Sequence, residues 1–212
     1  MLKLTSLFTK LRFLLTLRSQ LLLAFIFLCS SCSIDPNQKV NKNIKIDKPL
    51  VITTFTVLAD ISRNVAGERL LIKSITKEGY EIHGYKPTPS DLILASQANL
   101  IVENGLGLEL WADKFTNSAG NIPRIVLSDG ITPLLIEGDS YAGKPNPHVW
   151  MSPIKAIHYV DKLVEAFSEI DPAGSETFEI NAQTYKTKLI NLDNELRQSI
   201  NKIPKKNRVL VT

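Results

Sequence analysis

Cysteine is almost absent from this chain of 212 residues, and its distribution excludes two kinds of architecture. The only two cysteines, Cys29 and Cys32, lie near the N-terminus, and residues 33–212 contain none. That part of the chain can therefore form neither a disulfide framework nor a cysteine-based metal site.

A charge excess of one sign is also missing outside the N-terminus. The formal net charge is +4, from 25 Lys and Arg against 21 Asp and Glu. Four of the basic residues lie within residues 1–31, which contain no acidic residue, so the rest of the chain is formally neutral. Nucleic-acid binding needs a basic face, and the short cluster Lys205, Lys206 and Arg208 is more typical of a solvated turn. We therefore expect no nucleic-acid partner.

Apolar residues, in contrast, are distributed along the whole chain. They make up 44% of it, and charged residues make up 22%. This composition is that of an ordinary globular protein and argues against long disorder. The length allows one large domain, or one domain with part of another.

Long hydrophobic runs are absent, and the longest run is typical of an export signal. Residues 21–28 are apolar without interruption, follow a basic segment and precede small residues. This order predicts a secretory signal peptide over residues 1–31. Only 16 residues, 19–34, separate Arg18 from Asp35, which is short for a membrane-spanning helix. An uncleaved membrane anchor is the alternative, because signals and anchors differ mainly in length and flanks.

The end of this segment, Ser30-Ser31-Cys32, resembles the end of a bacterial lipobox, although Cys29 stands where leucine is usual. The resemblance implies that Cys32 is lipidated and that the exported protein is anchored to the membrane, in the periplasm or at the cell surface. Without that processing, both cysteines are merely signal-peptide residues. Residues 32–49, rich in Asn, Lys, Asp and Pro, predict a flexible tether.

Short strands and helices alternate in the next part of the chain. Runs of apolar and β-branched residues predict four strands, at residues 50–55, 70–75, 100–102 and 124–127. Helical spacing predicts helices between them, at residues 58–66, 88–98 and 108–115. This alternation favours βα units and a mainly parallel sheet, so we expect residues 50–171 to form one α/β lobe.

The pattern then becomes helical. Residues 152–170 predict one helix, and residues 172–204 predict a long one with no Pro or Gly between Gly174 and Pro204. At 1.5 Å per residue the long helix would span about 45 Å, enough to continue beyond one lobe. Residues 205–212, with a predicted strand over 208–212, would begin another lobe.

Two of the three histidines have an unusual setting. His83 and His148 each lie in a Pro-rich segment that leads into a helix, whereas His158 lies inside a predicted helix. Such segments have few conformations and can hold an imidazole in one orientation, and ligands of open α/β sheets bind beyond the carboxyl ends of strands. The two histidines are 65 residues apart and form no local motif. From the residues alone, both a shared metal and partly exposed polar loops stay open.

Three blocks carry a family resemblance. Residues 81–91 contain His-Gly-Tyr-Lys-Pro-Thr-Pro-Ser-Asp, residues 104–111 read Asn-Gly-Leu-Gly-Leu-Glu-Leu-Trp, and residues 143–153 contain Asn-Pro-His-Val-Trp. With the helical stretch 182–203, they resemble the metal-binding solute-binding lipoproteins of ABC importers, cluster A-I. The resemblance extends from about residue 51 to the end.

The resemblance implies two α/β lobes joined by one long helix, with the metal between the lobes. It implies that His83 and His148 are the two ligands of the first lobe. The family takes two more ligands, Glu or His and then Asp, from the second lobe, and no residue of this sequence matches them. We therefore expect a C-terminally truncated chain whose second lobe is largely missing.

The implied function is capture of a divalent metal, without catalysis, by a monomer that delivers it to a permease and its ATPase. Imidazole suits Zn, Mn and Fe, and carboxylates shift the preference toward Mn and Fe. The His-rich loop common in the zinc branch is absent, and residues 143–153 are closer to the manganese and iron branch, which favours Mn²⁺ or Fe²⁺ over Zn²⁺. Asp91 either orients His83 or caps the helix that follows it, and a turn role suffices for Asn104.

Two alternatives stay open. A truncated or split-gene fragment would have a weak metal transport role or none. A zinc hydrolase would need a third protein ligand, an open coordination position and a general base, and the sequence offers no convincing set.

Overall fold

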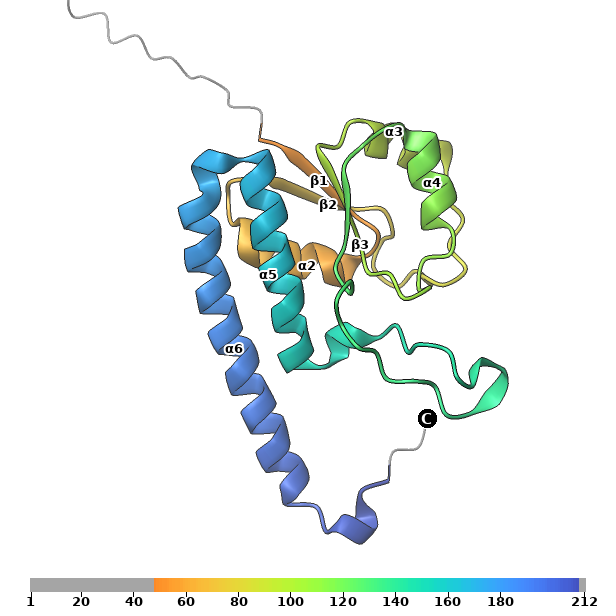
Figure 1. The fold of residues 1–212 in the computed structure, drawn as a ribbon, viewed down its shortest axis with the longest axis vertical. Helices are drawn as coiled ribbons and strands as arrows, with labels where there is room; N and C mark the ends of the chain where they lie inside the picture. The colour runs from red at the N-terminus through yellow and green to blue at the C-terminus, as the bar shows by residue number, and fades with distance from the viewer. Residues whose placement is uncertain (1–47, 210–212) are drawn as a thin grey trace, which may run out of the picture. The chain divides into compact units, whose positions relative to one another are not determined.

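The computed structural model describes residues 48–209 (Figure 1). The predicted signal peptide at residues 1–31, the predicted lipidation site Cys32 and all but the last two residues of the predicted tether 32–49 lie outside the described residues. Residues 210–212 lie outside them as well. Among residues 48–209, no helix is both long and apolar enough to cross a membrane.

A parallel sheet of four strands, in the order β2-β1-β3-β4, forms the centre of the fold. The strands are β1 (Leu50–Thr53), β2 (Leu71–Ser74), β3 (Leu100–Glu103) and β4 (Arg124–Val126). Ile52 of β1 lies opposite Lys73 of β2 on one side and Ile101 of β3 on the other. All pairings in this sheet are parallel, which confirms the α/β fold class expected from the sequence.

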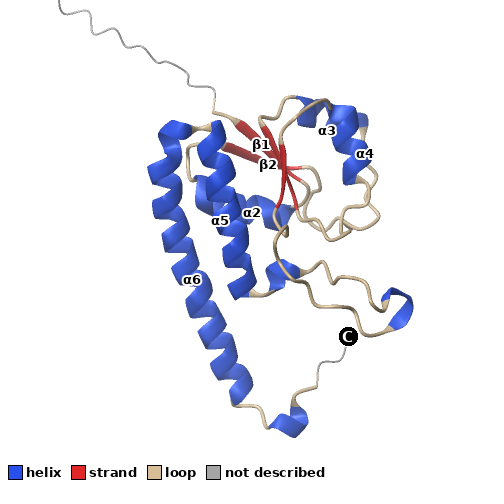
Figure 2. Cartoon of the chain, in the orientation of Figure 1, coloured by secondary structure: helices blue, strands red, loops and turns tan. Residues whose placement is uncertain are grey.

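A helix follows each of the first three strands and connects it to the next. These helices are α2 (Thr56–Ala66), α3 (Pro89–Ser96) and α4 (Ala112–Ala119). Two further helices, α5 (Pro153–Ile170) and α6 (Ser175–Asn201), come after β4. Helices α3 and α4 lie on one side of the sheet, and α2, α5 and α6 lie on the other (Figure 2).

The apolar core accordingly has two parts, one on each face of the sheet. Successive strand residues point to opposite faces, so Val51 belongs to the cluster formed with α2 and α5, while Ile52 belongs to the one formed with α3 and α4. The larger cluster contains Tyr159, Phe167 and Phe178, which are fully buried. Apolar strands of this kind are typical of a parallel sheet that is covered on both faces.

The direction of the strands determines where a site can form. Because all four strands are parallel, the loops that follow β2, β3 and β4 leave the same edge of the sheet. The loop after β2 carries His83, and the loop after β4 carries His148. Residues far apart in the sequence therefore reach one edge.

One helix begins later than the sequence predicts. The helix expected over residues 108–115 begins at Ala112. Gly105, Leu106 and Gly107 all have positive φ, so the chain first makes a left-handed turn after β3. Leu106 is the only non-glycine residue with positive φ in the described part of the chain.

The strand predicted over residues 208–212 does not begin at Arg208. Lys205–Asn207 form a short 3-10 helix, and the backbone N–H of Arg208 donates to the carbonyl of Lys205 at 3.2 Å. An N–H that closes a turn is not available to a strand ladder. Val209 is not in a strand either, and residues 210–212 of the predicted strand lie outside the described residues.

The long helix is present, but it is shorter than the range 172–204. Pro172–Gly174 form a separate 3-10 turn, and α6 has 27 residues, a length of about 40 Å. Beyond Leu189, no residue of α6 is buried. Its role as a linking helix stays a prediction, as does the division into a lobe at 50–171 and the start of a second lobe at 205–212.

Candidate metal site

The structure brings His83 and His148 together. Their ring centroids are 5.5 Å apart, with an angle of 64° between the ring planes. Both histidines line a cavity of about 810 Å³, which is also bordered by Leu106, Tyr141 and Lys144. A shared metal requires such proximity, and the ligand assignment itself stays a prediction.

The side chain of Asn146 determines which nitrogen of His148 is protonated. Its Oδ1 lies 3.1 Å from the backbone N of His148 and 2.9 Å from Nδ1 of the ring. The backbone N–H can only donate, so the atom that faces it is the amide oxygen, and Nδ1 must donate to that same oxygen. The proton therefore sits on Nδ1, and Nε2 keeps the lone pair that a metal needs.

The surroundings of His148 favour the neutral ring. Burial lowers the pKa of His148, and the adjacent His83 lowers it further. The ring also lies 5.3 Å from the indole of Trp150, which in turn packs 5.0 Å from Phe55. Burial and the neighbouring imidazole thus favour the neutral ring, which is the form that binds metals.

The loop of His83 is more exposed, and its restraints are on the backbone. The N–H of His83 donates to Oε1 of Glu81 at 2.8 Å. The carbonyl of Ile82 accepts a hydrogen bond of 2.9 Å from Nε1 of Trp111. Trp111 itself stacks edge-on against Tyr85 and Phe115, so the start of α4 holds this loop in place.

Asp91 caps α3, which is one of the two roles that its position allowed. Its Oδ2 accepts from the backbone N and Oγ1 of Thr88, at 2.7 and 2.8 Å, and from the Tyr85 hydroxyl at 2.9 Å. Burial, with the Asp91 hydrogen bond second, raises the pKa of Tyr85 to about 12, so this hydroxyl remains a donor. In the described part of the chain, Asp91 makes no hydrogen bond to His83.

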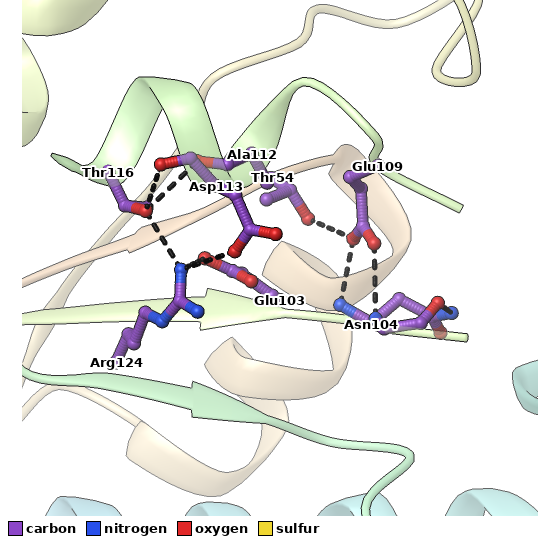
Figure 3. Close-up of polar contacts among 9 residues, drawn as sticks. Thr54, Glu103, Asn104, Glu109, Ala112, Asp113, Thr116 and Arg124 are labelled. Atoms are coloured by element: carbon purple, nitrogen blue, oxygen red, sulfur yellow. Dashed lines mark hydrogen bonds and ion pairs between the residues drawn. The ribbon is translucent and has the colours of Figure 1, made fainter. Parts of the chain in front are cut away.

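Two buried polar residues of the block after β3, Asn104 and Glu109, form a network beneath the candidate site; the sequence suggested only a turn role for Asn104 and no role for Glu109. Glu109 accepts from the backbone N of Asn104 at 2.7 Å, from that of Gly105 at 3.1 Å and from Oγ1 of Thr54 at 2.7 Å (Figure 3). Burial raises the pKa of Glu109, and these donors oppose the shift. A carboxylate within an apolar stretch was the signal that could have revealed this network.

A second carboxylate at the end of β3 is less well satisfied. Glu103 is buried, and its Oε1 has no hydrogen-bond donor, although Arg124 Nη1 lies 3.6 Å away (Figure 3). The same guanidinium donates to Asp113 and to Thr116, both at 2.9 Å. Burial raises the pKa of Glu103 to about 7, against the opposing effect of Arg124.

Comparison with known proteins places the chain in a family. Residues 51–212 match the family described as zinc-uptake complex component A, periplasmic. The chain belongs to this family. Membership in the zinc-uptake component A family confirms the resemblance carried by the three sequence blocks.

Two curated proteins with metal-related names are similar to this chain in sequence. The iron-binding protein YfeA of Yersinia pestis is 44% identical over 191 residues, covering 90% of this chain and 60% of that protein. The manganese ABC transporter substrate-binding lipoprotein PsaA of Streptococcus pneumoniae is 34% identical over 199 residues, covering 91% of this chain and 63% of that protein.

A solved structure of the Mn-bound periplasmic metal binding protein from Candidatus Liberibacter asiaticus matches with a TM-score of 0.68 and 31% identity. The match covers 76% of this chain and 60% of that one. The chain thus spans about 60% of the length of the relatives that it matches.

Proposed function

We propose that this chain captures a divalent transition metal as the substrate-binding component of an ABC importer, with His83 and His148 as ligands. The strongest support is the 5.5 Å approach of the two imidazoles, in a cavity at the carboxyl edge of the sheet, in a member of a metal-uptake family. Neutral imidazole is a ligand for Zn²⁺, Mn²⁺ and Fe²⁺. Binding should weaken on acidification, because a protonated imidazole cannot ligate.

We propose Mn²⁺ or Fe²⁺ as the metal, in preference to Zn²⁺. The names of two relatives refer to iron and manganese, while the family description refers to zinc uptake. Among residues 48–209, no group of three or more His, Cys, Asp or Glu side chains could hold a metal ion. Two imidazoles alone discriminate poorly among these metals, so Zn²⁺ should compete in solution.

The proposed setting is outside the cytoplasm, with the chain anchored to the membrane through a lipid on Cys32. In this setting the chain, as a monomer, would deliver its metal to a permease and an ATPase. The family description says periplasmic, and one relative is named an ABC transporter substrate-binding lipoprotein. We propose no catalytic step, because the family is a transport component.

Isothermal titration of the purified full chain with MnCl₂, FeCl₂ and ZnCl₂ tests the ligand assignment. We expect His83→Ala and His148→Ala each to weaken binding at least about tenfold, or roughly 1.4 kcal/mol. His158→Ala is the matched control, because Nε2 of His158 contacts the carbonyl of Asp129 at 2.8 Å and lies outside the pair. It should bind as the wild type does.

The same titrations separate the alternatives. Unchanged affinity in both His83→Ala and His148→Ala would overturn the ligand assignment. A wild-type chain that binds none of the three metals would favour the fragment without a transport role.

A further inference from the structure

The side chain of Asn104 joins three parts of the fold beneath the His148 loop. It is fully buried at the end of β3. Its Nδ2 donates to the carbonyl of Pro147 and to that of Gly105, both at 3.0 Å. Its Oδ1 accepts from the hydroxyl of Tyr159, in α5, at 2.6 Å. One amide therefore connects β3, α5 and the residue before His148.

The chemistry of these partners demands an amide in one orientation. Two carbonyl oxygens can only accept, so the NH₂ group must face them. The oxygen of Asn104 then faces Tyr159, whose hydroxyl donates to it. An aspartate would place an oxygen against the carbonyls of Gly105 and Pro147, which is why an asparagine is required here.

The peptide bond between Pro147 and His148 is held at both of its polar groups. Its carbonyl accepts from Asn104, and its N–H donates to Asn146. A peptide unit is planar, so fixing both groups fixes the plane and the starting point of the His148 side chain. Asn146 then orients the ring itself through Nδ1.

The backbone of Asn104 is itself held by the side chain of Glu109. The carboxylate of Glu109 holds the backbone N–H groups of Asn104 and Gly105 at 2.7 and 3.1 Å. These bonds close the left-handed turn in which Gly105, Leu106 and Gly107 have φ of 87°, 54° and 76°. The turn and the amide therefore form one rigid support.

We propose that Asn104 is a positioning residue for the metal ligand His148, acting through the Pro147 carbonyl, and that Tyr159 holds Asn104 in the working orientation. The proposal rests on the proposed function, since it requires His148 to bind the metal. Residues that orient metal ligands typically change affinity by about 10–100-fold when they are replaced. No contact between Asn104 and the metal is involved.

The test is a titration of the full chain with ZnCl₂, chosen because Zn²⁺ binds imidazole strongly and is diamagnetic. We expect Asn104→Asp to weaken binding about tenfold or more, and Tyr159→Phe to weaken it less, about threefold. Asn181→Asp is the matched control, because Nδ2 of Asn181 also donates to a carbonyl, that of Val65, at 3.0 Å, between α6 and α2. It should lose stability without losing Zn²⁺ affinity.

A metal-free readout separates positioning from general damage. Nitrogen-15 NMR of the His148 ring should show the Nδ1-protonated tautomer in the wild type and in Asn181→Asp. In Asn104→Asp and Tyr159→Phe, we expect a mixture of tautomers and faster exchange of the His148 amide. If Asn104→Asp fails to fold, the Tyr159→Phe variant tests the positioning role instead, because it keeps the ring packing and removes only the hydroxyl.

Two different failures are distinguishable. If His148→Ala binds Zn²⁺ as the wild type does, the proposed function fails, whatever the NMR spectra show. If His148→Ala weakens binding while folded Asn104→Asp or Tyr159→Phe retains wild-type affinity and a wild-type tautomer, the positioning role is overturned and the ligand assignment stands.

Discussion

The two histidine loops reach the same cavity, but they are held in different ways. His148 has a buried support, since Asn104 and Asn146 fix its peptide and Asn146 fixes its ring. Both histidines are exposed, but the loop of His83 is held through the backbone of Ile82 by Trp111. The proposed ligand His148 is thus fixed at its peptide and its ring, whereas the contacts of the His83 loop fix its backbone.

A second difference lies beneath these loops, between two carboxylates near the end of β3. Glu109 receives three hydrogen bonds and supports the loop that holds His148. Glu103, the last residue of β3, is buried with an unsatisfied Oε1. Burying a carboxylate costs less when its oxygens are satisfied, so the loss of Glu109 should destabilise the fold more than the loss of Glu103.

Removing Glu109 should have the largest effect. Glu109→Ala leaves the N–H groups of Asn104 and Gly105 and the hydroxyl of Thr54 without their acceptor. At about 1–3 kcal/mol for each unsatisfied group, we expect a loss of roughly 4 kcal/mol in the free energy of unfolding. Denaturant titration measures this loss.

The control for this change is Glu179→Ala, at an exposed position of α6. It should change the unfolding free energy by no more than about 0.5 kcal/mol. A loss below about 1 kcal/mol in Glu109→Ala would contradict the supporting role of this carboxylate.

Glu103 should make stability depend on pH, in the opposite direction to a well-paired carboxylate. Its pKa rises from 4.5 to about 7 on folding, so the folded state holds the proton more tightly. Its contribution to the free energy of unfolding is fully present below pH 4.5. This contribution is lost as the pH rises to about 7, a change of about 3 kcal/mol.

The variant Glu103→Gln should lack this pH dependence. Denaturant titration from pH 4.5 to 8 measures the decline in unfolding free energy with pH. We expect this decline to be about 2–3 kcal/mol smaller in the variant than in the wild type. Parallel curves for the two proteins would show that Glu103 does not titrate in this range.

On the His148 side, Asn146→Ala should reduce metal affinity more than stability. The variant loses the acceptor of Nδ1, so the ring can adopt either tautomer. We expect about tenfold weaker Zn²⁺ binding by calorimetry. The unfolding free energy of the metal-free protein should change by about 1 kcal/mol or less, because the contact is exposed.

On the His83 side, Trp111→Phe should have the smallest effect. It removes the hydrogen bond to the Ile82 carbonyl and keeps an aromatic ring beside Tyr85. Because this contact restrains the backbone of the His83 loop and not the imidazole, we expect only about threefold weaker Zn²⁺ binding. A larger loss than in Asn146→Ala would reverse the comparison between the two loops.

Much of the site could be predicted from local sequence. The Pro-rich segments around His83 and His148 and the block that follows β3 carried the family resemblance, which the comparisons confirm. The cap of α3 by Thr88 and Asp91 was also predictable, because it depends on residues three apart in the sequence. The parallel sheet was predictable as well, because the alternation of strands and helices can be recognised from short stretches of sequence.

The tertiary structure decided what short-range patterns cannot encode. Asn104 and Pro147 are 43 residues apart, and nothing local to either one predicts their hydrogen bond. The later start of α4 depends on a left-handed turn that is closed by the Glu109 carboxylate. The sequence alone thus determined which residues are candidate ligands. Only packing determined which buried groups hold them, because a buried hydrogen bond depends on elements that meet in space.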